Sequence, residues 1–568
     1  MKLTLGAYEQ RVDDAVSALV AAKAADRIWQ HDATFWGGDE ARGHSVANRL
    51  GWLDVASQMR ERVGEIEAFA AKVKADGFTD AVLLGMGGSS LAPEVLRQSI
   101  ADHASNGWPR LHVLDTTDPA TILAVSDSID PARTLFFVSS KSGTTLEALS
   151  LFSYFHEMVE KAKPGRAGEN FVAVTDAGTP LEALAHEHGF RHVFVNPGDI
   201  GGRYSALSYF GLAPAAVAGV DVAKLLDRGI AAATSARDAR SDPLRLGVAL
   251  GELALAGRDK CTFIVSPRIA SFGLWVEQLI AESTGKEGRG ILPVASEPLG
   301  TPAHYGADRV FAQLRLEGDS NGAEDALAGA LASEGHPVVT IDLDDAYDLG
   351  REFFRWEFAV AVAGQVLGIN PFDEPNVQES KDNTNRVLQE FEATGKLDAP
   401  FVSDSGVTVV IGGTDAAQPS LTGVLEELFE AIVAGDYVAV TAYLQPTERA
   451  QQAFDDIRKA IRDSRIVATT LGYGPRFLHS TGQLHKGGPP RGIFLQVTAS
   501  SARDIPIPGK PFSFGQFKRA QSIGDFQSLV SHARPVVRVH LGTDVDAGLR
   551  QLVDAVRVAA AAGAVAGR

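Results

Sequence analysis

The stretch Thr134-Leu-Phe-Phe-Val-Ser-Ser-Lys-Ser-Gly-Thr-Thr-Leu-Glu-Ala-Leu149 joins a short apolar run to a polar loop and then to a helical pattern. An apolar run of this length is typical of a buried strand, and the helix that follows indicates a βαβ unit in a parallel sheet. The loop between them, residues 139–145, holds five hydroxyl side chains, one lysine and one glycine. Hydroxyl and backbone N–H groups can surround a phosphate dianion without a metal. The stretch therefore predicts a parallel sheet with an anion-binding loop at its edge.

Similar apolar runs recur on both sides of this stretch and alternate with helical patterns, so we expect an α/β protein. Residues 1–76 indicate a helical N-terminal segment. Two doubly wound parallel-sheet domains are expected at 77–225 and 226–395, and a C-terminal α/β region at 396–568, after a Gly-, Pro- and Ser-rich boundary at 396–423. The expected strands are 81–84, 111–114, 134–138, 171–174, 192–195, 262–265, 291–294, 310–316, 337–343, 407–411, 437–444, 466–470, 493–498 and 536–541.

Composition excludes several classes of protein. The chain has 568 residues and a net charge of −18, which argues against a nucleic-acid or anionic-membrane partner. No apolar run approaches the roughly 20 residues that span a bilayer, and the N-terminus has no apolar signal segment, so we expect a cytoplasmic protein. The single cysteine, Cys261, allows no internal disulfide and is expected to be a core residue.

A second polar loop, Gly85-Met-Gly-Gly-Ser-Ser90, follows the first expected strand. Its spacing is neither that of a dinucleotide-binding fingerprint nor that of a P-loop. Parallel strands of one sheet end at the same edge, so both loops are expected to point into one crevice. For each loop a simpler interpretation stays open: a tight turn at 85–90, and a capping box between Thr144 and Glu147.

The two loops, GMGGSS and SKSGTT, resemble the sugar-isomerase (SIS) domain of phosphoglucose isomerases. The resemblance implies that the loops hold the phosphate of a sugar phosphate, with no cofactor and no metal. It also implies a set of substrate contacts: Gly88, Ser89, Ser140, Ser142 and Thr145, with Lys141 adding positive charge.

Moving a proton between the adjacent carbons of an aldose and a ketose needs a base and a cation that stabilises the enediolate. The segment Gly201-Gly-Arg-Tyr-Ser205 resembles a family motif that makes Arg203 the stabilising cation. Glu277–Lys286 resembles the family's Q-x-x-x-E-S-x-G-K, which makes Glu282 the base, with Gln278 one turn earlier on the same helix face. A third family motif, at 370–381, assigns Lys381 to ring opening.

The sequence departs from the family pattern in three places. Glu374 and Gln378 stand where the family has Gln and Glu, and we expect Glu374 to face away from the phosphate. Arg309 stands where the family has a histidine, often supplied across a dimer interface, that takes part in ring opening. Arginine is a poor base at neutral pH, so Arg309 either only binds or is replaced by a nearby histidine. The candidates are His304, His479 and His485.

The likeness to ordinary phosphoglucose isomerases covers about residues 40–385. The rest, with Leu478-His-Ser-Thr-Gly-Gln-Leu-His-Lys-Gly-Gly488, resembles the C-terminal part of bifunctional transaldolase–phosphoglucose isomerases, although no transaldolase barrel precedes residue 77. The resemblance implies interconversion of glucose 6-phosphate and fructose 6-phosphate, without transaldolase activity, by a homodimer. Alternatives are additional use of mannose 6-phosphate, an amino-sugar phosphate isomerase, and a non-catalytic sugar-phosphate sensor.

Overall fold

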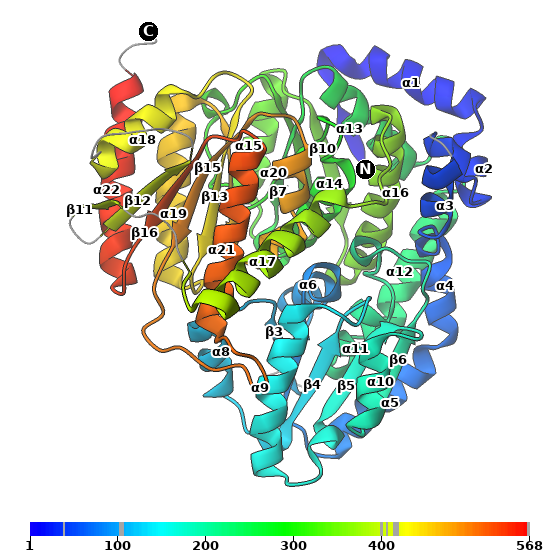
Figure 1. The fold of residues 1–568 in the computed structure, drawn as a ribbon. Helices are drawn as coiled ribbons and strands as arrows, with labels where there is room; N and C mark the ends of the chain where they lie inside the picture. Colours follow the sequence, from blue (N-terminus) through cyan, green and yellow to red (C-terminus); the bar gives the residue numbers. More distant parts are fainter. Residues whose placement is uncertain (38–39, 102–106, 398–401, 405–406, 413–419, 565–568) are drawn as a thin grey trace.

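The computed structural model describes residues 1–37, 40–101, 107–397, 402–404, 407–412 and 420–564. It contains three β-sheets with helices packed against their faces (Figure 1). Every strand expected from the sequence forms, with ends that differ by a few residues. The α/β class is therefore confirmed, and it follows from the alternation of short apolar runs with helical patterns.

The first sheet is entirely parallel and has the strand order β3-β2-β4-β5-β6. Because β3 lies on one side of β2 while β4 and its successors lie on the other, the order reverses between β2 and β4. Ligands of open α/β sheets bind at such a switch point. The strands are β2 (Asp80–Gly85), β3 (Arg110–Leu114), β4 (Thr134–Ser139), β5 (Phe171–Asp176) and β6 (His192–Asn196), with helices α6 (Leu91–Ser99), α8 (Pro119–Ser126), α9 (Leu146–Ala162) and α10 (Pro180–Glu187).

The second sheet has the order β1-β10-β9-β7-β8 and is parallel except for β1. The N-terminal segment is therefore not helical throughout, because β1 adds an antiparallel edge strand too short to leave a sequence pattern. The strands are β1 (Lys2–Thr4), β7 (Lys260–Val265), β8 (Leu292–Val294), β9 (Arg309–Leu316) and β10 (Val338–Leu343). Its helices are α14 (Phe272–Thr284), α15 (Gly322–Ser333) and α16 (Leu349–Leu367). Cys261 lies buried in β7, as expected.

Helices before and between these sheets share one large hydrophobic core with them. The N-terminal helices are α1 (Glu9–Ala21), α2 (Ala24–Trp29), α3 (Glu40–Ala47), α4 (Trp52–Glu61) and α5 (Val63–Ala75). The connecting helices are α11 (Tyr209–Val217), α12 (Val222–Ser235) and α13 (Asp242–Leu255).

The third sheet has the order β11-β12-β16-β15-β13-β14, and its last four strands are parallel. The strands are β11 (Val402–Asp404), β12 (Val407–Gly412), β13 (Tyr437–Tyr443), β14 (Ala468–Tyr473), β15 (Gly492–Thr498) and β16 (Val536–His540). The helices are α17 (Pro375–Thr394), α18 (Leu421–Glu430), α19 (Glu448–Arg465), α20 (Gly482–Gly487), α21 (Phe514–Ser531) and α22 (Val545–Ala564). Much of the boundary expected at 396–423 lies outside the described residues.

The C-terminal region does not form a separate layer, because α17 and α21 lie side by side and pack toward the first sheet (Figure 1). Phe514 and Phe517 of α21 are buried in the same core cluster as Phe136 of β4. Each buried phenylalanine contributes about 1.5–3 kcal/mol. This packing brings C-terminal side chains to the carboxyl edge of the first sheet. Among the described residues, no helix has the length and apolar character needed to cross a membrane.

Candidate active site

The two hydroxyl-rich loops meet at the switch point of the first sheet, as the sequence predicts. The Ser139 hydroxyl donates to the Ser89 carbonyl at 3.1 Å. The first loop also touches the turn that carries Arg203: a Cβ on Gly88 would lie 1.9 Å from the Gly202 carbonyl oxygen. Any side chain at residue 88 would therefore separate these two segments.

The second loop leaves the start of α9 open. Thr145 is the N-cap residue, but its side chain does not cap the helix; its hydroxyl lies 2.8 Å from that of Ser140. The capping box between Thr144 and Glu147 does not form. Uncapped N–H groups and the helix dipole favour an anion at this position. Together with the paired hydroxyls they form a site for a phosphate group.

Two of the expected substrate contacts are directed elsewhere. The Lys141 ammonium contacts Asp176 and the Gly198 carbonyl, so its charge is already compensated. Burial raises the pKa of Asp176, although Lys141 opposes this. The Ser142 hydroxyl is exposed and lies 2.9 Å from that of Thr144. Ser89, Ser140 and Thr145 are the expected hydroxyl contacts that the structure gathers at the loops.

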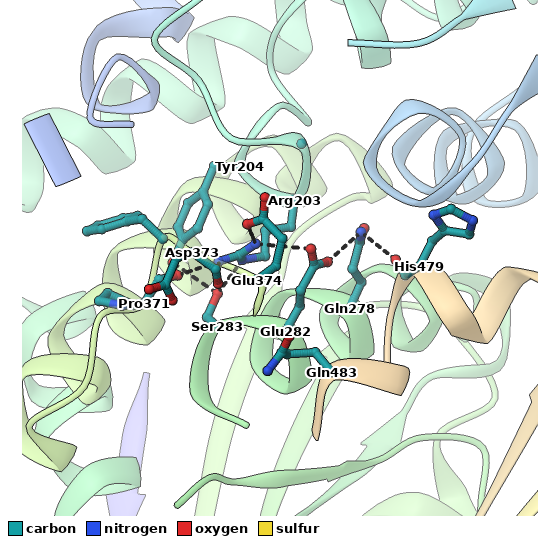
Figure 2. Close-up of polar contacts among 12 residues, drawn as sticks. Arg203, Tyr204, Gln278, Glu282, Ser283, Pro371, Asp373, Glu374, His479 and Gln483 are labelled. Carbon is teal, nitrogen blue, oxygen red and sulfur yellow. Dashed lines mark hydrogen bonds and ion pairs between the residues drawn. The ribbon is translucent and has the colours of Figure 1, made fainter. Parts of the chain in front are cut away.

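Arg203 is the centre of a buried hydrogen-bond network (Figure 2). Its guanidinium donates to the Ser283 hydroxyl at 2.8 Å, to Glu282 at 3.1 Å and to Glu374 at 2.9 Å. It also donates to the carbonyls of Pro371 and Asp373. Burial alone would lower its pKa, but the carboxylates of Glu282 and Glu374 raise the pKa of Arg203 above its ordinary value. The side chain is a fixed cation with little rotational freedom.

Glu282 is held between Arg203 and Gln278, as the i, i+4 spacing predicts. Gln278 donates to Glu282 at 2.9 Å and to the His479 carbonyl at 2.8 Å (Figure 2). Burial raises the pKa of Glu282 above that of a free glutamate; Arg203 opposes the shift and Glu374 adds to it. A carboxylate whose pKa is raised in this way can accept and return a proton at neutral pH.

Glu374 faces the Arg203 centre, where its carboxylate pairs with the guanidinium at 2.9 Å. Gln378, the other exchanged position, is exposed and donates to Asp382 at 2.9 Å. The segment that carries Glu374 is held by Lys286, the last residue of the Q-x-x-x-E-S-x-G-K motif, for which no role was predicted. Its ammonium binds Asp373, and burial lowers the pKa of Lys286 to about 8.

A cavity of about 300 Å³ lies beside this centre and is lined by Thr145, Lys381, His479 and Glu147. Nε2 of His479 lies 3.1 Å from Oε1 of Glu147, which also accepts from Gln521 at 2.7 Å. Burial would raise the pKa of Glu147, but His479 and Lys381 lower it below its ordinary value. The cavity therefore brings the charged carboxylate of Glu147 together with the side chains of His479 and Lys381.

The other candidates for ring opening lie elsewhere. Arg309 is fully buried and donates to Thr262 at 2.7 Å and to Glu297 at 3.2 Å. His304 pairs with Asp463. His485 packs in the core, 3.0 Å from the Tyr437 hydroxyl, and burial lowers its pKa to about 3. None of these three side chains lines the 300 Å³ cavity.

Sequence reasoning missed Glu147, Gln521 and Ser283 as members of the site. Glu147 lies in the first turn of the helix that follows the SKSGTT loop. This position could have indicated a role in the site, although a helix capping box was the simpler interpretation of Glu147. Ser283 follows Glu282 directly and fixes the Arg203 guanidinium. Gln521 left no local signal. Across the described residues, no group of three or more His, Cys, Asp or Glu side chains is arranged to hold a metal ion.

Known proteins resemble up to about two thirds of this chain. Residues 42–287 match the family model for phosphoglucose isomerase. A probable glucose-6-phosphate isomerase of Methanococcus maripaludis is 28% identical over 377 residues, 60% of this chain and 84% of that protein. The glucose-6-phosphate isomerases of Rubrobacter xylanophilus and Acetivibrio thermocellus are 30% and 31% identical, over 57% and 60% of this chain and 85% and 87% of those proteins.

Solved structures agree in fold. A hypothetical protein of Thermus thermophilus aligns with a TM-score of 0.59 and 26% identity, covering 68% of this chain and 99% of that one. A glucose-6-phosphate isomerase of Chlamydia trachomatis aligns with a TM-score of 0.54 and 19% identity, covering 68% of this chain and 88% of that one. The matches to the Rubrobacter and Acetivibrio proteins cover most of the length of those two proteins. The chain therefore belongs to the phosphoglucose isomerase family.

Proposed function

We propose that the protein interconverts glucose 6-phosphate and fructose 6-phosphate through an enediolate. One observation carries the proposal: Glu282, a buried carboxylate with a raised pKa, contacts the fixed cation Arg203 beside the phosphate-type loops. The three named relatives bear the name of this activity, either outright or as probable.

Glu282 acts as the base that removes the proton next to the substrate carbonyl and returns it to the neighbouring carbon. Arg203 supplies the positive charge that stabilises the enediolate oxygens as they form. A cation that is already oriented needs no reorganisation during the reaction, which is the main advantage of electrostatic preorganisation. Gln278 orients the carboxylate through its hydrogen bond to Oε2.

The phosphate is held by the loops after β2 and β4. Ser140 and Thr145 present paired hydroxyls, and the start of α9 offers N–H groups. Ser89 and Gly88 bring the first loop to the same place and keep it against the Arg203 turn. Lys141 acts indirectly, by fixing the second loop to Asp176 at the end of β5.

Ring opening is assigned to His479, with Lys381 in the same cavity. A histidine paired with a carboxylate can exchange protons with a ring oxygen near neutral pH. Glu147 keeps the imidazole oriented through the 3.1 Å contact between Oε1 and Nε2. In this assignment the chain supplies its own histidine, so the reaction does not depend on a side chain from a second subunit. The homodimer and the cytoplasmic location stay predictions.

His479→Gln is expected to lower kcat for cyclic fructose 6-phosphate about 10²-fold, because one general acid–base group is lost. The measurement is steady-state kinetics, with KM expected to change little. His532→Gln is the matched control: His532 also pairs with a glutamate, Glu379 at 3.0 Å, but does not line the cavity. Full activity of His479→Gln would exclude this assignment.

Glu374→Gln, which restores the family residue, is expected to move the acidic limb of the kcat/KM profile to lower pH. The carboxylate of Glu374 raises the pKa of Glu282, so its removal leaves Glu282 ionised at lower pH. The base works only when ionised, and activity is therefore retained further into acid. Gln378→Glu, at the exposed exchanged position, is the control and should leave the limb in place. An unchanged limb in Glu374→Gln would show that the two carboxylates do not interact.

Glucose 6-phosphate and mannose 6-phosphate should be compared side by side in an assay coupled to a reporter enzyme. Conversion of glucose 6-phosphate to fructose 6-phosphate supports the proposal, and equal use of mannose 6-phosphate would indicate a dual isomerase. Binding of both without turnover would indicate a sensor. The joint presence of Arg203, Glu282 and Lys381 favours an enzyme, because a sensor has no need of this set.

A further inference from the structure

The C-terminal sheet has a switch point of its own. β14 lies on one side of β13, while β15 and then β16 lie on the other, so the strand order reverses between β13 and β15. The carboxyl ends of β13, β15 and β16 line a cavity of about 640 Å³, at Tyr443, Thr498 and His540. A cavity of this size at a switch point is a typical small-molecule site.

The polar lining of this cavity is mainly cationic. Lys518, Arg519 and Arg538 line it, against one carboxylate, Asp504, among the described residues. Asp504 is engaged at the start of α21, where it accepts from Ser513 and from the Gly515 N–H at 2.8 Å. Its charge is therefore used to hold the helix end.

Arg538 is a deeply buried cation of this lining. It is 4% exposed and donates to Gln496 at 2.6 Å and to the Ser522 carbonyl at 2.7 Å, which are both neutral acceptors. No carboxylate of the described residues forms an ion pair with its guanidinium. Burial lowers the pKa of Arg538 to about 10, although Tyr443 and the carboxylate of Asp525 oppose this shift. Asp525 is itself paired with Lys486 at 3.0 Å. The buried charge of Arg538 is therefore only partly offset, and a further anion close to it would be favourable.

Hydroxyl groups complete the polar wall. Thr498 and Ser500 lie 3.0 Å from the two ring nitrogens of His540, and Ser501 lies 3.3 Å from the Lys518 ammonium. Burial and then the positive charges of Arg519, Arg538 and Lys518 lower the pKa of His540. Lys518 itself pairs with Asp118 at 2.8 Å. Phe391 and Leu397 add apolar side chains to the lining.

We propose that this cavity binds a small phosphorylated metabolite, distinct from the substrate of the Arg203 centre. The phosphate would lie between Arg519, Arg538 and the hydroxyls of the β15 loop, and the rest of the ligand against Phe391 and Leu397. No residue is shared with the 300 Å³ cavity.

The position of α21 makes this site regulatory. Lys518, Arg519 and Ser522 line the larger cavity, while Phe517 and Gln521 of the same helix line the 300 Å³ cavity. Gln521 donates to Glu147, the carboxylate that orients His479. A ligand that shifts α21 therefore changes the hydrogen bond at Glu147, which links the two sites through one rigid element.

Titration calorimetry in a phosphate-free buffer tests the site with inorganic phosphate, ribose 5-phosphate and AMP, and with adenosine as the probe that lacks phosphate. Arg519→Gln is the test variant, since Arg519 is exposed and its replacement spares the core. Arg491→Gln, an exposed arginine of the same region outside the cavity, is the matched charge control. Ser140→Ala separates this site from the phosphate loops.

At least one phosphorylated probe is expected to bind, and to bind at least tenfold more weakly to Arg519→Gln but equally to Arg491→Gln and Ser140→Ala. Adenosine should bind at least tenfold more weakly than AMP. Equal affinity of the probe for the wild type and Arg519→Gln, or loss of probe binding in Ser140→Ala alone, would overturn the proposed site.

The bound probe should also change kcat or KM for fructose 6-phosphate at least twofold in the wild type but not in Arg519→Gln. Binding with unchanged kinetics would overturn the link through α21. The calorimetric binding measurements test the second site whether or not the protein is an isomerase.

Discussion

Replacing Glu282 with glutamine is expected to lower kcat about 10³-fold while the affinity for fructose 6-phosphate stays within a few fold. A general base contributes roughly 10²–10⁴ in rate, and an amide cannot accept the proton. The amide oxygen can still accept the Arg203 hydrogen bond that Glu282 accepts at 3.1 Å, so the centre should keep its shape. Steady-state kinetics and calorimetric binding of fructose 6-phosphate give the two quantities separately.

Glu277→Gln is the matched control for this experiment. Glu277 precedes Gln278 on α14 and is half-buried, and burial raises its pKa to about 8, but it has no contact with Arg203. Its replacement should leave kcat within a few fold. Normal binding together with full turnover in Glu282→Gln would show that another group is the base.

Replacing Arg203 with lysine is expected to lower kcat/KM by about 10² to 10³, although the positive charge is kept. An ammonium cannot reproduce the planar fork that reaches Ser283, Glu282 and Glu374 at the same time. The enediolate would then meet a cation that has to reorient, and removal of preorganised donors of this kind costs a comparable factor. Kinetics and thermal unfolding should be measured on the same preparation.

Arg309→Lys provides the control, because Arg309 is equally buried and paired with a glutamate but lies outside the site. It is expected to lower the unfolding temperature and leave kcat/KM within a few fold in the folded protein. If folded Arg309→Lys loses turnover while Arg203→Lys keeps it, Arg309 acts at the position of the family histidine and the central role of Arg203 is wrong.

Local sequence patterns predicted the parts of the site that depend on strand order. The loops after β2 and β4 follow adjacent parallel strands, so their meeting at 3.1 Å between Ser139 and Ser89 could be expected. The contact of Gln278 with Glu282 follows from helix periodicity. The resemblance to a known family was needed to connect Arg203 with Glu282, which are 79 residues apart.

Contacts between distant segments could not be predicted in the same way. His479 and His485 lie in one motif, yet one lines the cavity and the other packs against Tyr437. The choice depends on the pairing of His479 with Glu147, 332 residues away. Lys141 had the charge for a phosphate contact, but Asp176 at the end of β5 neutralises it. These outcomes are set by tertiary packing, which no local pattern records.

The most direct test of the central claim is a proton NMR time course of fructose 6-phosphate with the purified protein in D2O. Proton transfer through Glu282 and an enediolate predicts that glucose 6-phosphate forms and that part of it carries deuterium at C2, because the carboxylic acid exchanges its proton with solvent between removal and return. Glu282→Gln should form neither product at a comparable rate. Failure to form glucose 6-phosphate, or its formation with no deuterium at C2, would contradict the account.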